Sequence, residues 1–221
     1  MVRTLVVSAF EPEIAPLRLV IAGRRDVEAA TVGVGAVDAA VGAARAIAAA
    51  RASRVIFVGT AGIYLRSRAT AAIGTALIAG ELHCVSTAAL RGDGYLPELV
   101  TVRFQTSGAL SAALAAGARS PTRQLETVAC PLAITRSATL GRQIATATGA
   151  TLESLEAFAV GRAAGAAGVD FAAVLGVANR VGPAGHHEWL SHHRAASRAA
   201  CRLVARFLAT SMSISAGARG G

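Results

Sequence analysis

Two patterns of hydrophobic and polar positions alternate along the chain. Short apolar runs, typical of strands buried on both faces, are followed by alanine-rich segments with apolar residues at helical spacing. The apolar runs predict strands at residues 4–9, 25–31, 54–58, 74–84, 127–134, 151–154 and 169–178. The alanine-rich segments predict helices at residues 14–19, 37–52, 107–116, 137–148, 155–167 and from about 192 to 209. Strands and helices therefore alternate through most of the chain.

This alternation predicts the fold class α/β. We expect a three-layer sandwich in which a mainly parallel, mixed central sheet is flanked by helices. The 221 residues, of which 53% are hydrophobic, suffice for one large core, and no linker divides them. We therefore expect a single domain over residues 1–210 and a small, polar, frayed tail over residues 211–221.

The stretch from residue 151 to 183 carries two polar residues against an apolar background. Glu156 lies where a predicted strand gives way to a helix, and Asn179 lies at the carboxyl end of the next strand. Each residue alone has a simple structural role, since acidic residues favour helix N-termini and asparagines favour turns. Ligand sites of α/β sheets lie outside the carboxyl ends of the strands. Together the two residues therefore form a candidate site.

Composition excludes several kinds of chemistry. All 22 basic residues are arginine, so catalysis through a lysine Schiff base and the lysine of a phosphate-binding P-loop are both excluded. The formal charge is +9, but the arginines are scattered and are not interleaved with aromatic residues. We therefore expect no nucleic-acid partner. A basic surface would still favour anionic small molecules.

Cysteines and clustered histidines are the residues that could bind a metal. Cys84, Cys130 and Cys201 lie far apart, each in an apolar run where a cysteine usually packs in the core. Four of the five histidines lie within residues 186–193 around Trp189, at spacings of one, five, six and seven. These spacings fit zinc poorly and fit a solvated loop, a helix start or a pocket rim better. We expect no metal.

The expected cofactor and cellular location depend on sequence features that the chain lacks. Gly33 and Gly35 form a G-x-G turn between a strand and a helix, but Asp38 stands where a dinucleotide fingerprint needs its third glycine. A nicotinamide cofactor is therefore rejected, and we expect no other cofactor. The chain starts directly with a strand and has no apolar segment of membrane-spanning length. We expect a cytoplasmic protein without a membrane partner.

Six motifs in chain order resemble the nucleoside phosphorylase and nucleosidase superfamily. They are SAFEPEIAPL, GVGAVDAA, VIFVGTAGIY, GDGYLPE, the segment from ITRSATLG to AFAVGRAA, and ANRVGP. The last three are most similar to the futalosine hydrolase family of an alternative menaquinone pathway. The resemblance covers almost the whole chain and implies a phosphorylase/hydrolase-like fold. It also implies an N-ribosyl hydrolase that assembles as a homodimer or larger homo-oligomer, often with a neighbour's residues closing the pocket.

The resemblance assigns roles to individual residues. Glu13 matches the carboxylate that activates the attacking water, with Glu11 as its rival, and only one of the two should face the site because residues two apart do not share a helix face. Glu156 matches the carboxylate that binds the ribose hydroxyls. Asn179 stands where many nucleosidases have an aspartate that protonates purine N7, and asparagine is similar to the futalosine hydrolase pattern. The remaining residues expected to bind substrate are Leu155, Ala61, Gly62, Ser137 and Tyr95.

Other positions depart from the related methylthioadenosine/S-adenosylhomocysteine nucleosidases. Leu175 replaces an arginine near the nucleophilic water, Ala178 replaces a serine, and Thr75 stands in place of an aspartate. A phosphate nucleophile needs charged and hydroxyl donors, so these changes favour water. We expect a hydrolase that releases a purine base by attack of water at C1′. Another nucleosidase, a nucleoside phosphorylase and a catalytically silent nucleoside-binding protein stay as alternatives.

Overall fold

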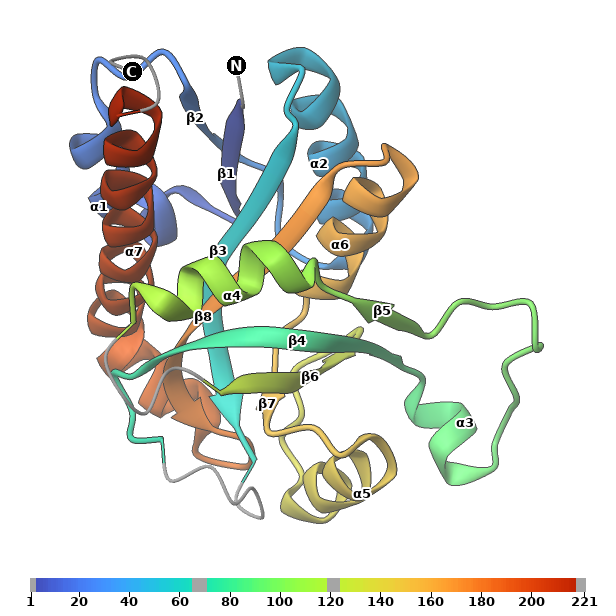
Figure 1. The fold of residues 1–221 in the computed structure, drawn as a ribbon. Helices are drawn as coiled ribbons and strands as arrows, with labels where there is room; N and C mark the ends of the chain where they lie inside the picture. The colour runs from blue at the N-terminus through green and yellow to red at the C-terminus, as the bar shows by residue number, and fades with distance from the viewer. Residues whose placement is uncertain (1–2, 65–70, 119–123, 218–221) are drawn as a thin grey trace.

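The computed structural model describes residues 3–64, 71–118 and 124–217, and in these ranges strands and helices alternate along the chain (Figure 1). The strands are β1 (Thr4–Ser8), β2 (Val27–Thr31), β3 (Arg54–Ile63), β4 (Ala76–Val85), β5 (Arg103–Gln105), β6 (Leu125–Pro131), β7 (Leu152–Glu153) and β8 (Asp170–Arg180). The helices are α1 (Glu11–Ile21), α2 (Ala36–Ala50), α3 (Thr87–Arg91), α4 (Gly108–Ala116), α5 (Ala138–Thr148), α6 (Ala157–Ala166) and α7 (Gly185–Gly217). The division of the chain at residue 210 stays a prediction.

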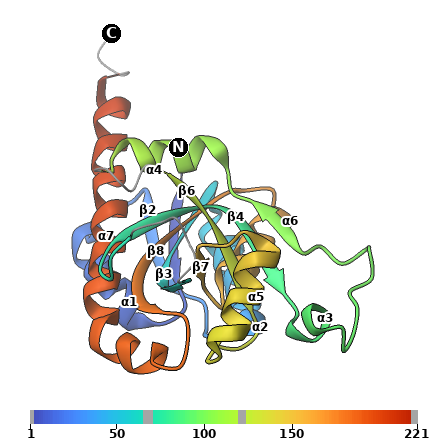
Figure 2. The same cartoon turned by 90° about the horizontal axis from the view of Figure 1, so that it is seen from below.

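The strands form one mixed sheet in the order β2-β1-β3-β7-β6-β4-β5, and β8 pairs with both β3 and β4. β8 runs parallel to β3 and antiparallel to β4, so it joins these two strands on one side. β7 and β6 join them on the other side, and the sheet therefore closes on itself. Figure 2 shows β4 curving around this closed part of the sheet. The expected mixed α/β fold is confirmed, whereas the simple three-layer sandwich must be corrected to a curled sheet.

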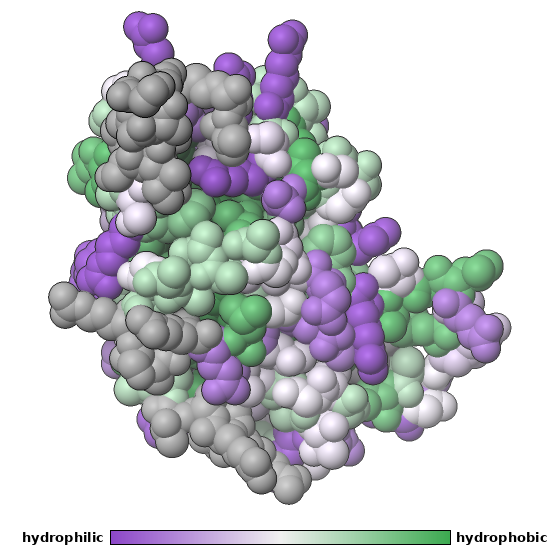
Figure 3. All heavy atoms as spheres, viewed as in Figure 1, coloured by the Kyte–Doolittle hydropathy of each residue, from purple (hydrophilic) through white to green (hydrophobic). Residues whose placement is uncertain are grey.

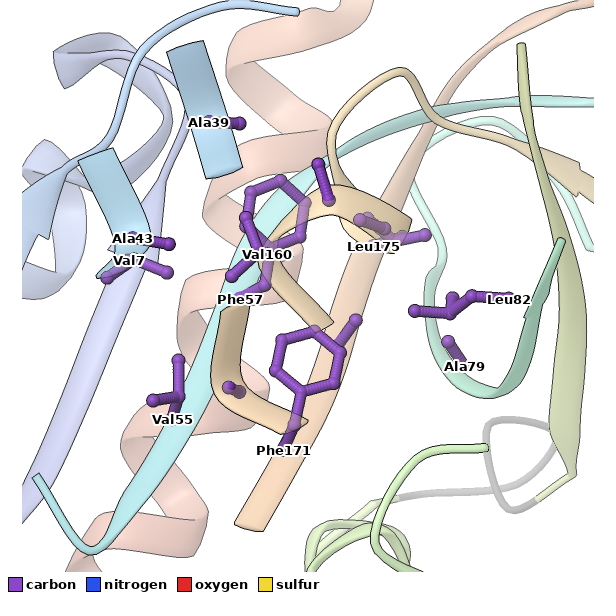
Figure 4. Close-up of a cluster of buried hydrophobic side chains, with 14 of the residues drawn as sticks. Val7, Ala39, Ala43, Val55, Phe57, Ala79, Leu82, Val160, Phe171 and Leu175 are labelled. Atoms are coloured by element: carbon purple, nitrogen blue, oxygen red, sulfur yellow. The ribbon is translucent and has the colours of Figure 1, made fainter. Parts of the chain in front are cut away.

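Two hydrophobic cores cover the two faces of the sheet. On one face α2 and α6 pack over Phe57, Phe171 and Leu175, as Figure 4 shows. On the other face α1, α4 and α7 pack over residues such as Ile56 and Val174. The small residues of the chain let these helices approach the strands closely. A Cβ at Gly176 of β8, for example, would overlap the backbone of α7, so this glycine lets α7 lie directly against β8.

The start of α7 differs from the sequence prediction. The helix was expected from about residue 192 but begins at Gly185, so all four clustered histidines lie on it. Glu188 in the first turn accepts hydrogen bonds from the backbone N–H and the guanidinium of Arg180, at 2.7 to 3.0 Å. This pair ties the first turn of α7 to the end of β8. The early start brings the side chains of the first two turns to the carboxyl end of the sheet.

Candidate active site

A cavity of about 350 Å³ lies where the carboxyl ends of β3 and β8 meet the first turns of α1, α6 and α7. Because β3 and β8 run parallel, their carboxyl ends lie at the same edge of the sheet. The size is within the usual range for small-molecule sites. The lining residues are Ala9, Phe10, Glu13, Val34, Thr60, Ala61, Gly62, Ile134, Glu153, Ser154, Leu155, Glu156, Asn179, Gly185, His186 and Trp189.

Glu13 in the first turn of α1 is one of the acidic residues of the cavity and is only 4% exposed. Its Oε1 accepts hydrogen bonds from the backbone N–H and the hydroxyl of Thr60, at 2.9 and 2.8 Å. Its Oε2 is buried and has no hydrogen-bond partner among the described residues. Burial and, to a smaller extent, the charge of Glu156 raise the pKa of Glu13 from 4.5 to about 7, against the lowering effect of the hydrogen bonds from Thr60. Glu13 can therefore exchange a proton near neutral pH.

Glu11, the rival of Glu13, does not line the cavity. Its side chain lies at the surface and accepts two hydrogen bonds from the guanidinium of Arg18, at 2.8 and 3.1 Å. Of the two carboxylates, Glu13 lines the cavity and Glu11 does not.

The pKa of Glu13 predicts how stability depends on pH. A pKa raised on folding means that the folded state binds the proton more tightly, so its contribution to stability is full below about 4.5 and is lost as the pH rises through about 7. At about 1.4 kcal/mol per pKa unit, the loss is about 3 kcal/mol. Glu13→Gln removes this titration. Urea unfolding at pH 5 and pH 8 should show the parent losing more stability than the variant, and equal losses would contradict the assignment.

Glu156 precedes α6 and lies beside the glycine turn before α2. It is 9% exposed, and its Oε1 accepts a hydrogen bond from the backbone N–H of Gly35 at 2.9 Å. Gly35 has a positive φ of 85°, a conformation that favours glycine and that directs this N–H to the carboxylate. Burial raises the pKa of Glu156, and the Gly35 N–H opposes the rise. The bond holds one oxygen and leaves the rest of the carboxylate able to accept hydrogen bonds.

Asn179 lies near the end of β8, beside an irregularity in the pairing with β3. Ala61 pairs with Val177 and Gly62 pairs with Asn179, so Ala178 is an extra residue on β8. The amide of Asn179 donates a hydrogen bond to the carbonyl of Arg180 at 2.9 Å. A Cβ at Gly62 would lie 3.0 Å from the amide nitrogen, so this glycine leaves room for the side chain. The extra residue turns Asn179 to the cavity edge.

The cavity brings together six of the eight residues expected to bind substrate or catalyse its conversion. These six are Glu13, Ala61, Gly62, Leu155, Glu156 and Asn179. Ser137 is not among the lining residues, because its hydroxyl caps α5 by accepting from the N–H of Leu140. Tyr95 is 84% exposed in the segment between α3 and β5, which projects from the body in Figures 1 and 2. The cavity of a single chain therefore excludes both residues.

Sequence reasoning missed several residues of the cavity wall. Glu153 is buried and accepts hydrogen bonds from the hydroxyl of Tyr64 at 2.7 Å and from the backbone N–H of Thr135 at 3.0 Å. Burial and then the charge of Glu153 raise the pKa of Tyr64, which keeps the phenol protonated as a donor. Through Thr135, Glu153 anchors the loop that carries Ile134 into the cavity wall. The sequence signal that could have identified Glu153 was its position three residues before Glu156.

An aromatic wall also went unpredicted. Trp189 stacks on His193 with the ring centroids 4.4 Å apart, and it lies 6.2 Å from His186 and 6.3 Å from Phe10. Its indole N–H donates a hydrogen bond to the hydroxyl of Thr60 at 3.0 Å. The histidine cluster was read as a loop or a pocket rim, and of its members His186 does line the cavity.

The charges around the cavity limit its chemistry. None of the described residues that line it is an arginine, although the chain has 22 basic residues. Leu175, which stands where related enzymes were expected to have an arginine, is fully buried in the core.

Within the described ranges, no three His, Cys, Asp or Glu side chains are grouped to hold a metal ion. In the same ranges, no helix has the length and hydropathy to span a membrane.

Comparisons with known proteins identify the family of the chain. Residues 10–209 match the Phosphorylase superfamily, and the chain belongs to this family of enzymes. A comparison with curated proteins gives no match.

Among solved structures, the fold is similar to the 5′-methylthioadenosine/S-adenosylhomocysteine nucleosidase of Neisseria meningitidis in complex with methylthio-immucillin-A. The identity is 20%, the TM-score is 0.82, and 94% of this chain and 99% of the other are covered. It is also similar to futalosine hydrolase of Helicobacter pylori, with 14% identity, a TM-score of 0.83 and coverage of 95% and 98%. Identities this low show a shared fold.

Proposed function

We propose that the protein is an N-ribosyl hydrolase, which cleaves the N-glycosidic bond of a purine nucleoside derivative by attack of water at C1′. The observation that carries the proposal is the pair of buried carboxylates, Glu13 and Glu156, which face one cavity without an arginine beside them. Cleavage of this bond builds positive charge on the sugar, and carboxylates stabilise that charge. Membership of the Phosphorylase superfamily and the nucleosidase fold support the same chemistry.

Each carboxylate has a distinct role in the proposed reaction. Glu13 is the general base, because its pKa of about 7 lets it be ionised at neutral pH and still accept a proton from water. Glu156 accepts hydrogen bonds from the ribose hydroxyls, because Gly35 fixes its orientation through Oε1. Glu156 also lies close enough to Glu13 to raise its pKa, so both groups act on the same sugar.

Asn179 recognises the purine base. Its amide N–H can donate to N7 and its carbonyl can accept from an exocyclic amine, but it cannot protonate N7 as an aspartate could. Leaving-group activation therefore rests on hydrogen bonding. This asparagine is the observation that favours a futalosine-type substrate, and hence a role in menaquinone biosynthesis, over a methylthioadenosine-type substrate.

Release of the base from a panel of nucleosides, with and without phosphate, tests this function. The panel combines adenine and hypoxanthine with different 5′ substituents and includes futalosine. We expect a free base and a free sugar, at a rate that phosphate does not change, because no arginine stands among the described residues that line the cavity. A sugar 1-phosphate product would refute the hydrolase. Thermal stabilisation by a nucleoside without turnover would instead identify a silent binding protein.

Asn179→Asp should keep the fold and shift the reaction toward lower pH. Only a protonated aspartic acid has an O–H, and this single proton can go either to N7 or to the carbonyl of Arg180, which the amide of Asn179 contacts in the parent. Turnover of adenine and hypoxanthine nucleosides, followed from pH 5 to 9, measures the shift and any change in base preference. If both the pH profile and the preference are unchanged, Asn179 has no part in base recognition.

We further propose that the protein forms a homo-oligomer in the cytoplasm. Val34 and Ile134 line the cavity but are 60% and 55% exposed, so the cavity has an apolar, open edge. The projecting segment carries Tyr95, Leu96 and Leu99 at the surface, and Figure 3 shows hydrophobic residues gathered on it. Exposed apolar patches of this kind favour a contact with a second copy. Analytical ultracentrifugation tests it, and a monomer at all concentrations would exclude it.

A further inference from the structure

Thr60 lies between Glu13 and Trp189 and bonds to both. Its backbone N–H and its hydroxyl lie 2.9 and 2.8 Å from Oε1 of Glu13, and the indole nitrogen of Trp189 lies 3.0 Å from the same hydroxyl. The three residues come from α1, β3 and α7. They form a continuous hydrogen-bonded chain along one wall of the cavity.

The chemistry of the three groups fixes the direction of each bond. The indole N–H can only donate, so it occupies a lone pair of the Thr60 hydroxyl. The hydroxyl has a single proton, and its other close partner is Oε1 of Glu13, which accepts it. Oε1 therefore receives two donors from Thr60. Oε2 receives none among the described residues, although it is buried.

Trp189 is itself held in place on several sides. Its ring stacks on His193 and lies near His186 and Phe10, and it stands in the helix whose first turn is fixed by Arg180 and Glu188. The direction of its N–H is therefore set by the packing of α7, which does not depend on a bound ligand.

We propose that Trp189 and Thr60 are positioning residues that make the two oxygens of Glu13 inequivalent. The indole N–H orients the Thr60 hydroxyl, both donors of Thr60 hold Oε1, and Oε2 is left as the oxygen that takes the proton of the attacking water. The last clause rests on the proposed function. The hydrogen-bonded chain itself is a property of the folded protein and can be tested without substrate.

Several other ionisable groups lie beside this hydrogen-bonded chain, and their titration must be distinguished from the titration of Glu13. Glu156 from α6 raises the pKa of Glu13, and the thiol of Cys201 on α7 lies near enough to interact with its charge. His186 and His193 face the indole of Trp189. Variants of the two histidines are therefore the controls for any response of Trp189 to pH.

Because the chain has a single tryptophan, its indole N–H gives one resonance in the NMR spectrum of the ¹⁵N-labelled protein. In the parent this resonance should move with pH as Glu13 titrates, with a midpoint of about 7. Glu13→Gln and Thr60→Val should abolish the response, because they remove the titrating group and the connecting hydroxyl. Thr60→Ser should keep it, as should His186→Gln and His193→Gln. A response that survives in Glu13→Gln, or is lost with either histidine, would overturn the proposal.

Steady-state kinetics test the same hydrogen-bonded chain during turnover. Thr60→Val should lower kcat by about tenfold, as expected for one lost hydrogen bond to a charged group, with little change in KM. It should also raise the pKa that limits the acidic side of the pH profile, because a donor to the ionised form is lost. Thr60→Ser should restore both.

A double-mutant cycle decides whether Trp189 acts through Thr60. In the parent background, Trp189→Phe should lower kcat, but by less than Thr60→Val does. In the Thr60→Val background, Trp189→Phe should have no further effect on kcat. An equal loss of kcat in both backgrounds would mean that Trp189 acts on the substrate directly, and would overturn the proposal. If no nucleoside is turned over while the NMR response is as expected, the proposed function fails and the hydrogen-bonded chain stands.

Discussion

Glutamine in place of Glu13 is expected to lower kcat by roughly a hundredfold or more, which is the typical contribution of a general base. The variant keeps the shape of the side chain and can keep the hydrogen bonds of Thr60 to its amide oxygen. It lacks an oxygen at the position of Oε2 that could take a proton. Substrate affinity should change little, because the base acts on water.

The pH profile of the parent provides a second measurement of the same residue. Only the ionised form of Glu13 can accept a proton, so kcat/KM should fall about tenfold per pH unit below about 7. The residual activity of Glu13→Gln should lack this limb. Steady-state rates from pH 5 to 9, with the affinity of a non-reactive nucleoside analogue measured in parallel, separate the base from a binding group.

Glu11→Gln is the matched control for this variant. Glu11 lies two residues away, is exposed, and pairs only with Arg18 among the described residues, so its loss should cost less than about 1 kcal/mol and leave turnover unchanged. If Glu11→Gln abolishes turnover while Glu13→Gln is harmless, Glu13 is not the base even though the fold is as described.

The positions of Glu13, Glu156 and Asn179 could be predicted because each follows directly from a strand. Apolar runs identify buried strands, and the carboxyl ends of parallel strands meet at one edge of a sheet, so residues just beyond them converge. Ala61 and Gly62 were expected at the site from the resemblance. All five line one cavity in the structure.

The closure of the sheet and the start of α7 could not be read from local patterns. β7 has only two residues, and the antiparallel pairing of β4 with β8 joins residues 96 to 100 positions apart in the chain, from Ile78 with Val174 to Ala76 with Gly176. The segment after Pro183 has the glycine and histidines of a loop, and the hydrogen bonds between Arg180 and Glu188 that tie its first helical turn to β8 are not visible in a local pattern. Trp189 enters the site through that helix, and there it contacts Thr60 of β3.

Tyr95 and Ser137 were expected at the site from the resemblance alone. No strand end brings them there, and the physical signals at both positions are those of turns and caps. Tyr95 follows the glycine-rich turn after α3, and Ser137 precedes α5 at its N-cap. In a single chain they take these local roles, and a role in substrate binding stays a prediction.

Glu156→Gln is expected to damage both binding and turnover. The ionised carboxylate accepts hydrogen bonds from ribose hydroxyls in the ground state and stabilises the cationic sugar in the transition state. A neutral amide keeps one acceptor but loses the charge, so kcat should fall by roughly tenfold to a hundredfold beyond a rise in KM, as for removal of an electrostatic group of the transition state. The acidic limb set by Glu13 should also move to lower pH, because the charge of Glu156 raises the pKa of Glu13.

Steady-state kinetics, with the affinity for a nucleoside analogue measured by calorimetry, test Glu156→Gln against Glu126→Gln. Glu126 is also a buried carboxylate and bonds to the hydroxyl of Thr151, but it does not line the cavity. Its variant should lower stability and leave kcat, KM and the pH limb unchanged. Equal kinetic losses in the two variants would mean that removal of any buried carboxylate disturbs the fold, and that Glu156 has no direct contact with the ribose. If Glu156→Gln raises KM and leaves kcat unchanged, Glu156 only binds the substrate. The stabilisation of the cationic sugar would then be assigned to Glu13 and its neighbours.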